Sequence, residues 1–467
     1  MRTLPVLRPA GPYRSDDRGL LRAVSGAPLA EVGEAPPLLV RRTLEQQRRA
    51  RVEADGRPRA LGEERLRTLR IAGELFLTAT LDGERPEDYV RVQSLATGLP
   101  EAAVRRAMTQ LRDQLAGLGP ALGAQRPSGA GPDSPRAKWV RRASLLGVIA
   151  PSNHPATHGA WVQALALGYQ IAVRPGGRDP FTPLRLVRAL VQAGLGPAEA
   201  TVLPGSHAAA DTLVDTADLA LVYGGESTVA RYRDTSRVLV RGPGRTKALL
   251  LGTDQDDAVL DHLVQEVSDD GGVRCTNLTT VFTTGDHAAL ADALASRLAK
   301  LPVLPAADPD AVLPLRHISE ATALHAAVQA HARDAVDVSA AHHGADPHPL
   351  VQEEAAAMRP IVLRCDSPTH PGTAVEMPYP CVWVAPWRPE DGTGPLGDSL
   401  ALHLLDRDDG PAAEWLAALL RDAPTVRTLL RGPHHRWWRD PLLPHDGYLG
   451  QFLMEARGLV DTTEGTR

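Results

Sequence analysis

Lysine and cysteine are both scarce in this chain of 467 residues, which contains three of each. The cysteines Cys275, Cys365 and Cys381 form no CxxC pair and cannot build a disulfide framework, which is typical of a reducing compartment. No apolar run approaches the length needed to cross a bilayer, and the N-terminal residues mix proline and charge, which excludes a secretory signal. The sequence therefore predicts a cytoplasmic location and no membrane partner.

The chain also lacks an excess of charge of one sign. Its 51 basic and 56 acidic residues give a formal net charge of −5, which offers no basic surface for nucleic acid or anionic lipid. Because only Lys138, Lys247 and Lys300 are lysines, arginine supplies nearly all of the positive charge. Hydrophobic residues at 43% and charged residues at 23% are typical of a globular protein, and the length predicts two or three domains.

Two kinds of local pattern follow one another along the chain. Residues 40–118 repeat apolar positions at spacings of three and four, which predicts helices. The glycine- and proline-rich residues 117–138 predict a connection. After Trp139, short apolar strands alternate with amphipathic helices, as in "YQIAVRP" followed by "PFTPLRLVRALVQAGLG", and this alternation predicts parallel strands with crossover helices. The expected fold class is α/β with a doubly wound sheet.

A second α/β domain is expected to open near Lys247, where "KALLLG", an amphipathic helix and "LTTVFTT" repeat the alternation less regularly. The predicted division has three parts. Residues 1–246 hold N-terminal helices and a Rossmann-like domain, residues 247–435 hold a second domain that carries Cys275, and residues 436–467 pack back or join subunits.

The stretch "SDDGGVRCTN", residues 268–277, places Cys275 behind a glycine pair and beside Arg274. A cysteine nucleophile needs access, a low thiol pKa and donors aimed at the oxyanion that forms on the attacked carbonyl. The Cys275 backbone amide and the side-chain amide of Asn153, which follows a predicted strand, are candidates for these donors. A buried structural cysteine and a turn asparagine fit the same local features, so both interpretations stay open on these residues alone.

The order of the motifs resembles that of the aldehyde dehydrogenase superfamily. "PSNHP" is similar to the family's proline, tryptophan, asparagine turn, "YGGESTVA" to its glycine-serine turn at the nucleotide, and "VRGPGRTK" to its interdomain segment. "DDGGVRCTNLTTVF" resembles the nucleophile segment, "VEMPYPC" a late acidic motif and "PHDG" the terminal glycine motif. The resemblance covers roughly residues 40–455. It implies an aldehyde dehydrogenase-like fold, with two doubly wound α/β domains and a helical N-terminal segment.

The resemblance implies an NAD(P)-dependent oxidoreductase that interconverts an aldehyde and an acyl thioester or acid. Cys275 would carry the acyl group, and Asn153 would hold the oxyanion with the Cys275 amide. In hydrolytic members a glutamate of the interdomain segment activates water, and Arg241 stands at that position. Arginine cannot act as a general base, because its pKa exceeds about 12. As in the acylating branch, we therefore expect exchange with coenzyme A or a carrier-protein thiol, with Glu266 or Asp270 as alternative bases.

The resemblance also assigns the cofactor turns. Arg174 stands in place of the family's ribose-binding lysine, and Gly177, next to Arg178, in place of the acidic residue that favours NAD. The missing carboxylate and two guanidinium groups tolerate a 2′-phosphate, which favours NADP slightly over NAD. Glu376 matches the residue that bonds the nicotinamide ribose, whereas Pro378 replaces a phenylalanine. The implied cofactor-binding residues are Arg174, Gly177, Arg178, Gly224, Gly225, Glu226 and Glu376.

The remaining candidates receive simpler interpretations. His154 and His158 have the i, i+4 spacing of a metal pair, but no third ligand accompanies them, so no metal is expected. Trp437 and Trp438 are expected to pack internally or against another subunit rather than to wall a substrate pocket. The expected partners are a small-molecule aldehyde or acyl thioester and a second copy of the chain in a homodimer. A degenerate member that binds nucleotide or protein without turnover is the alternative.

Overall fold

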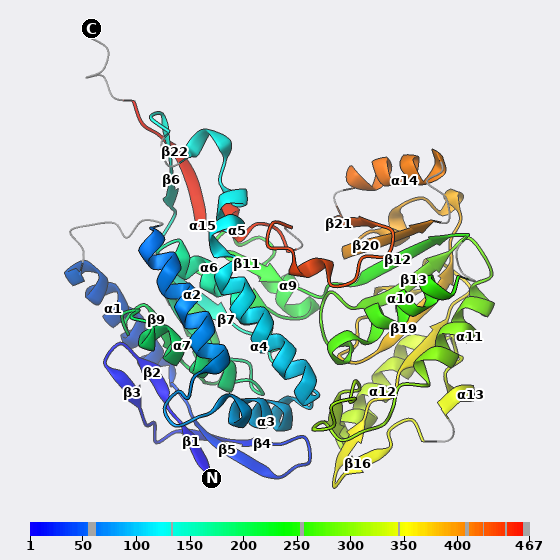
Figure 1. Cartoon of the computed structure of the whole chain (residues 1–467), viewed down its shortest axis with the longest axis horizontal. Coiled ribbons are helices and arrows are strands. Elements are labelled where there is room, and N and C mark those ends of the chain that lie inside the picture. Colours follow the sequence, from blue (N-terminus) through cyan, green and yellow to red (C-terminus); the bar gives the residue numbers. More distant parts are fainter. Residues whose placement is uncertain are drawn as a thin grey trace.

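The computed structural model consists of two lobes, each built on a seven-stranded sheet (Figure 1). The C-terminal segment returns from the second lobe to the first (Figure 1). No helix in the described part of the chain is long and apolar enough to cross a membrane. The structure describes residues 1–54, 62–131, 134–252, 256–343, 346–406, 411–423, 425–443 and 446–460.

The first lobe contains a sheet with the strand order β11-β10-β7-β8-β9-β2-β3. Strands β11 to β9 run parallel, β2 pairs antiparallel with β9, and β3 pairs antiparallel with β2 at the edge of the sheet. Because the central strands are buried on both faces, they read as continuous apolar runs, and the strands predicted after Trp139 are confirmed. The strands are β2 (Val6–Arg8), β3 (Gly11–Tyr13), β7 (Leu145–Ile149), β8 (Gln170–Arg174), β9 (Ala200–Val202), β10 (Leu219–Tyr223) and β11 (Val238–Arg241).

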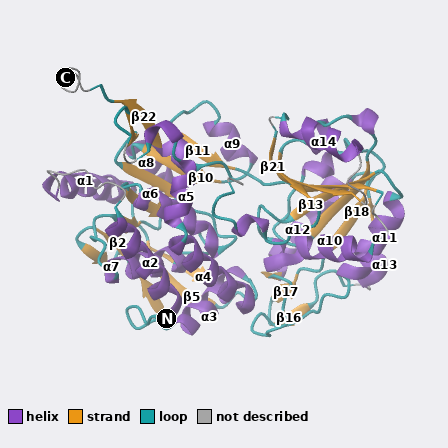
Figure 2. Ribbon diagram, turned by 45° about the horizontal axis from the view of Figure 1, so that its top comes forward, coloured by secondary structure: helices purple, strands orange, loops and turns teal. Residues whose placement is uncertain are grey.

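Helices lie on both faces of this sheet (Figure 2). The helices predicted within residues 40–118 form α1 (Pro37–Ala54), α2 (Glu63–Thr78), α3 (Pro86–Thr97) and α4 (Glu101–Ala116). The crossover helices are α6 (Gly159–Ala166), α7 (Phe181–Gln192), α8 (His207–Thr216) and α9 (Glu226–Tyr232).

Two parts of the first lobe differ from the prediction. Helix α5 (Leu118–Gln125) occupies the start of the segment predicted to be a connection, because Leu118 and Leu122 are buried one turn apart and Pro120 falls in the first turn, where proline is tolerated. The first 33 residues form strands that carried no prediction, since most are only three residues long. Besides β2 and β3 these are β1 (Arg2–Leu4), β4 (Arg18–Arg22) and β5 (Pro28–Gly33), which form a sheet of their own.

The second lobe contains a sheet with the order β15-β18-β19-β13-β12-β20-β21, parallel except for β15. Its strands are β12 (Thr246–Leu251), β13 (Leu278–Thr283), β15 (Val336–Asp337), β18 (Ile361–Arg364), β19 (Cys381–Pro386), β20 (Ser399–Asp406) and β21 (Val426–Arg431). Its helices are α10 (Asp257–Ser268), α11 (His287–Leu298), α12 (Ile318–Ala332), α13 (Ala340–His343) and α14 (Pro411–Arg421). The expected pair of doubly wound α/β sheets is confirmed.

Smaller elements connect and extend the lobes. Strands β14 (Leu315–His317), β16 (Leu350–Gln352) and β17 (Ala355–Ala357) form an antiparallel sheet. After the short helix α15 (Leu449–Leu453), β22 (Met454–Gly458) pairs with β6 (Ala137–Arg141) in a two-stranded ribbon that projects from the first lobe (Figure 1). The C-terminal segment thus packs back onto residues more than 300 positions earlier in the chain.

A buried guanidinium ties α7 to the segment after α2. Arg185 is fully buried and donates to three backbone carbonyls, those of Phe76 at 3.0 Å, Ala79 at 2.7 Å and Glu84 at 3.1 Å. The Glu84 carboxylate lies 3.5 Å from the same guanidinium and also pairs with Arg2. A charge that satisfies three carbonyls in the interior is costly to remove, because each partner would be left unpaired.

We predict that Arg185→Met lowers the free energy of unfolding by about 3–5 kcal/mol, because it leaves Glu84 and three carbonyls without their donor. Urea denaturation followed by circular dichroism measures the change. Arg70→Met, at an exposed position of α2, is the matched control and should stay within about 0.5 kcal/mol of the parent. Equal effects of the two substitutions would contradict the assignment.

Candidate active site

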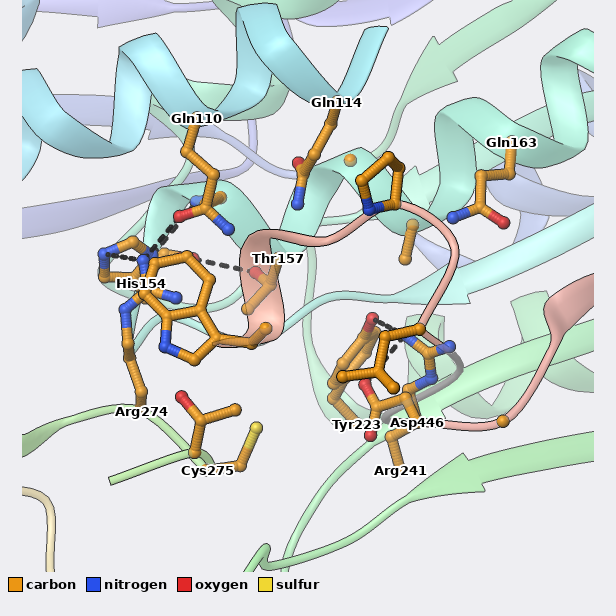
Figure 3. A pocket seen from close by; sticks show the side chains of 18 of the residues that line it. Gln110, Gln114, His154, Thr157, Gln163, Tyr223, Arg241, Arg274, Cys275 and Asp446 are labelled. Atoms are coloured by element: carbon orange, nitrogen blue, oxygen red, sulfur yellow. Dashed lines mark hydrogen bonds and ion pairs between the residues drawn. The ribbon is translucent and has the colours of Figure 1, made fainter. Parts of the chain in front are cut away.

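Cys275 lies in a pocket at the carboxyl ends of the first sheet's strands, covered by α4, α6 and the C-terminal segment (Figure 3). The turn after β7 contributes Asn153, and the ends of β10 and β11 contribute Tyr223 and Arg241. The C-terminal segment contributes Trp438 and other residues. The structure therefore brings Cys275 and Asn153 into one pocket, as the order of the motifs implied, although they are 122 positions apart in the sequence.

The glycine pair before Cys275 is required by backbone geometry. Asp270, Gly271 and Gly272 have φ values of 50°, 81° and 66°, three consecutive left-handed conformations after the end of α10. A Cβ on Gly272 would lie 2.6 Å from the backbone nitrogen of Pro380, closer than real side chains come. Any other residue at position 272 would therefore be strained for two reasons: its backbone would be left-handed, and its Cβ would clash with Pro380.

Asn277 holds the turned segment in shape. Its Oδ1 accepts from the Arg274 backbone N–H at 2.7 Å, and its Nδ2 donates to the carbonyls of Glu266 at 2.9 Å and Asp269 at 3.1 Å. This role was not predicted from the sequence. The only signal in the sequence was an asparagine two residues after the cysteine, and the structure shows that it is buried. These bonds fix the direction in which the cysteine leaves the turn.

A buried ion cluster joins this segment to α4 and to the Asn153 turn. Arg106 donates to Asp270 Oδ1 through Nη2 at 2.8 Å and Nε at 3.0 Å, and Arg274 Nε donates to Asp270 Oδ2 at 2.8 Å. His154 Nε2 lies 3.2 Å from the same carboxylate. Burial opposes ionisation of Asp270, but Arg274, His154 and Arg106 outweigh it and hold the pKa of the carboxyl well below its usual range. Asp270 is thus a structural anion and not a substitute base.

The Asn153 amide lies against the cysteine segment. Asn153 Nδ2 donates to the Val273 carbonyl at 2.8 Å, and its Oδ1 is buried with no hydrogen-bond partner in the described part of the chain. The next residue, His154, is buried, and burial together with Arg274 lowers its pKa to about 4. Its Nδ1 accepts from the Ala156 backbone, so His154 acts as a neutral part of the turn rather than as a metal ligand.

Cys275 itself is partly buried. Burial raises the pKa of the Cys275 thiol well above its ordinary value, and the carboxylates of Asp446 and Glu376 raise it further, whereas Arg274 and Arg241 act in the opposite direction. The thiol is therefore the resting form at neutral pH. A reactive thiolate has to be produced by a change in these neighbours, since burial favours the neutral group.

Arg241 is held in the pocket by two partners. Its Nη1 donates to the Tyr223 hydroxyl at 3.1 Å and pairs with Asp446 Oδ2 at 3.1 Å (Figure 3). Burial would lower the pKa of this guanidinium, but Asp446 and Tyr223 outweigh burial and raise it, so Arg241 keeps its proton. Asp446 comes from the segment expected to be a terminal glycine motif, whose first residues, Pro444 and His445, lie outside the described residues. Sequence reasoning missed Asp446.

The second carboxylate considered as a substitute base points elsewhere. Glu266 lies on α10, does not line the Cys275 pocket, and accepts from His435 Nδ1 at 2.8 Å. Burial raises the pKa of Glu266 to about 7, although His435 acts in the opposite direction.

Trp438 lines the Cys275 pocket, and the Arg274 guanidinium stacks 3.8 Å from its ring centroid. The tryptophan pair packs internally as expected, in a buried cluster with Ala401 and Leu430, and Trp438 lines the pocket as well.

A second cleft lies between the lobes, along the interdomain segment "VRGPGRTK". Glu376 Oε2 accepts from the backbone N–H groups of Gly244 at 2.7 Å and Arg245 at 2.8 Å, and burial raises the pKa of the Glu376 carboxyl. Glu226, expected near the nucleotide, pairs with the side chain of Arg245. This pairing removes the repulsion that an isolated Glu226 carboxylate would exert on a phosphate.

The turn after β8 forms a third pocket, lined by Arg174, Gly177 and Glu34. No atom lies within 4 Å of the place where a Cβ on Gly177 would stand, and the same holds for Gly225, so both glycines leave room for a nucleotide. Arg174 donates to the Gly205 carbonyl at 2.9 and 3.1 Å, and burial lowers the pKa of its guanidinium.

The expected pair of guanidinium groups for a 2′-phosphate does not form in this pocket. The side chain of Arg178 turns toward the second lobe and pairs with Glu320 of α12 at 2.5 Å. Glu34, at the end of β5, instead places a carboxylate in the pocket with Arg174. In this structure Arg178 is engaged by the carboxylate of Glu320, and its part in binding a nucleotide stays a prediction.

The sequence model that describes the aldehyde dehydrogenase family matches residues 64–391, more than half of the chain. The chain belongs to the aldehyde dehydrogenase family. Over 170 residues it is 27% identical to a probable methylmalonate-semialdehyde/malonate-semialdehyde dehydrogenase (acylating, mitochondrial) of Drosophila melanogaster, with 34% of this chain and 33% of the relative covered. Over 165 residues it is 27% identical to a malonate-semialdehyde dehydrogenase of Pseudomonas aeruginosa, with 33% of each chain covered. The matched segments thus span about a third of these relatives.

Solved structures of family members agree with the fold over nearly the whole chain. The aldehyde dehydrogenase KauB from Pseudomonas aeruginosa superposes with a TM-score of 0.82 at 14% identity, covering 98% of this chain and 96% of that chain. The NADP-dependent glyceraldehyde-3-phosphate dehydrogenase from Bacillus halodurans, complexed with NADP, gives 0.78 at 17% identity, covering 98% and 99%. At such identities the likeness shows the fold.

We predict that iodoacetamide labels Cys275 of the native protein faster than Cys365 or Cys381, because only Cys275 lines an open pocket while the others are buried. Since the pKa of Cys275 is raised, the labelling rate should keep increasing with pH and should not level off at pH about 8.5, the ordinary thiol value. Peptide mapping of protein labelled at a series of pH values measures both. Equal labelling of the three cysteines would remove Cys275 as the candidate nucleophile.

Proposed function

We propose that this protein is an NAD(P)-dependent aldehyde dehydrogenase-type oxidoreductase that works through Cys275. The observation that carries the proposal is the placement of Cys275 and Asn153 in one pocket at the carboxyl ends of the parallel strands. Ligands of doubly wound sheets bind at those ends. Because the nucleophile candidate and the oxyanion donor candidate lie in one pocket, we favour an active enzyme over a degenerate member that only binds nucleotide or protein.

The proposed reaction begins with attack of the Cys275 sulfur on the carbonyl carbon. A carbon–sulfur bond forms, the carbonyl π bond opens onto its oxygen, and the thiol proton passes to solvent water. The carbon–hydrogen bond of the resulting adduct then breaks as its oxygen re-forms the carbonyl. The Asn153 amide and the Cys275 backbone N–H donate to that oxygen. A bound nicotinamide supplies the hydride acceptor, or in reverse the hydride donor. The Cys275 side chain then carries the acyl group as a thioester.

The charged residues of the pocket favour transfer of this acyl group to a thiol. Arg241 keeps its proton and cannot activate water. Asp446 is a carboxylate in the pocket, but it pairs with Arg241 at 3.1 Å. We therefore propose coenzyme A or a carrier-protein thiol as the acyl acceptor, or as the donor in the reverse reduction. The Drosophila melanogaster relative, which is named as a probable acylating semialdehyde dehydrogenase, supports the same branch.

For the cofactor we propose that both dinucleotides bind and that NAD is preferred. The Glu34 carboxylate in the Arg174 pocket can accept from ribose hydroxyls and repels a 2′-phosphate. Gly224 and Gly225 precede α9, and Glu376 accepts from the backbone of the interdomain segment, so we assign these residues to the remaining part of the nucleotide path. A cytoplasmic homodimer, joined through the projecting ribbon of β6 and β22, completes the proposal.

We predict that Arg241→Glu shifts the products from thioester toward free acid, because a carboxylate at this position can take a proton from water. The reaction with aldehyde, NAD and coenzyme A is followed by mass spectrometry of the products. Acid formation without any thiol should rise by about tenfold or more. Arg241→Met, which removes the charge without adding a base, is the control and should not gain hydrolysis. Parent protein that forms acid equally fast with and without thiol would contradict the acylating proposal.

We predict that Glu34→Gln strengthens binding of NADP relative to NAD by about five- to tenfold, since removal of one carboxylate relieves repulsion of roughly 1 kcal/mol. Calorimetric titration with both nucleotides measures the ratio of dissociation constants. Glu31→Gln is the control: Glu31 lies on β5, shortly before Glu34, pairs with Arg18 and does not line the pocket. A ratio that does not change in Glu34→Gln would show that Glu34 does not face the ribose.

A further inference from the structure

Glutamine is concentrated in the wall of the Cys275 pocket. Gln110 and Gln114 lie four residues apart on one face of α4, and Gln163 lies on α6. All three side chains point into the pocket, across from Cys275 (Figure 3). An amide carries a donor and an acceptor, so the part that meets a ligand depends on what the amide oxygen already contacts.

The orientation of Gln110 is fixed by a group that can only donate. Arg274 Nη2 donates to Gln110 Oε1 at 2.5 Å. A guanidinium has no acceptor, so the atom facing it must be the amide oxygen. The NH₂ group of Gln110 is then the part available to a ligand.

A relay of amides fixes Gln163 in the same way. The Gly450 backbone N–H donates to Gln125 Oε1 at 2.7 Å, so Gln125 must present its nitrogen on the other side. That nitrogen donates to Gln163 Oε1 at 3.2 Å. Because its oxygen is occupied, Gln163 also offers its NH₂ group to the pocket.

The third amide packs its oxygen against a glycine. Gln114 Oε1 is buried with no hydrogen-bond partner in the described part of the chain. A Cβ on Gly159 would lie 1.9 Å from this oxygen, so the close approach depends on glycine at that position. With its oxygen against α6, Gln114 presents its nitrogen to the pocket (Figure 3).

Positive charge accompanies these three donors. Of the described residues that line the pocket, Arg241 and Arg274 are cationic and Asp446 is anionic, so two positive charges face one negative charge. His154 adds none, because its pKa of about 4 leaves it neutral at pH 7. The lining therefore carries one net positive charge, and the count is unchanged when Asp270 and Arg106, which lie behind Arg274, are included.

We propose that the wall formed by Gln110, Gln114 and Gln163 binds a carboxylate group of the substrate, so that the carbonyl compound is an oxo acid. In the reverse direction the substrate is the thioester of a dicarboxylic acid. Three NH₂ groups and a net positive charge complement a group that only accepts hydrogen bonds, and they do not complement an alkyl chain. The identity of the reacting carbonyl rests on the proposed function, whereas binding of the carboxylate does not require turnover.

The first test compares 4-oxobutanoate with its methyl ester, which has the same chain without the charge. We expect kcat/KM to be at least about tenfold higher for the oxo acid. Gln114→Glu keeps the shape of the side chain and replaces donors by negative charge, so the ratio of the two kcat/KM values should fall by about tenfold or more. Gln192→Glu, at the exposed end of α7, is the control and should leave the ratio unchanged. Equal kcat/KM values in the parent protein would overturn the inference.

The second test needs no turnover. Succinate, but not the neutral succinamide, should slow labelling of Cys275 by iodoacetamide at constant ionic strength, and Gln114→Glu should abolish the protection. If succinate protects Cys275 but the protein oxidises no aldehyde, the proposed function is contradicted and the carboxylate site is supported. If the protein oxidises aldehydes without preference for the oxo acid, and succinate gives no protection, the carboxylate site is contradicted and the proposed function is supported.

Discussion

The buried carboxylate of Asp270 holds together the parts of the pocket that must act jointly. It accepts from Arg106 on α4 and from Arg274 beside the cysteine, and it contacts His154 in the turn that carries Asn153. A carboxylate taken out of water is costly unless charges and donors surround it, so all three elements have to be present for any of them to be stable in this arrangement. The position of the thiol relative to the Asn153 amide therefore depends on this ion cluster, together with the Asn277 hydrogen bonds that hold the cysteine segment.

The replacement at Arg241 changes the electrostatics of the reacting centre as well as its acid–base chemistry. A glutamate there would add negative charge beside a thiol whose pKa burial already raises, whereas Arg241 acts against that shift. Asp446 offsets part of this effect and holds the guanidinium at 3.1 Å. Among the described residues, Arg241 and Asp446 are the two that line both the Cys275 pocket and the interdomain cleft. Movement of this pair would thus change both the charge beside the Cys275 thiol and the connection between the pocket and the interdomain cleft.

The sequence predicts what depends on local pattern and chain order. Buried parallel strands read as continuous apolar runs, so the alternation of strands and helices was predictable. The resemblance of the motif order to the aldehyde dehydrogenase family implied that Asn153 and Cys275 share one site. What escaped prediction depends on side-chain pairing between distant segments. Arg178 turns to Glu320 on the other lobe, and Glu34 enters the Arg174 pocket from a short strand with no periodic signal. No pattern within a window of the sequence encodes such pairings.

A carboxylate receptor in this pocket would place two negative groups, the substrate's carboxylate and the thiolate, in one enclosure of low dielectric. Their repulsion would make the thiolate harder to form unless a positive charge lies between them. Arg274 meets this requirement, because it donates to Gln110 in the proposed receptor and also opposes the rise in the Cys275 pKa. Its charge is fixed in place by Asp270 and by stacking on Trp438. The ion cluster that shapes the cysteine segment thereby also allows an anionic substrate to approach an anionic nucleophile.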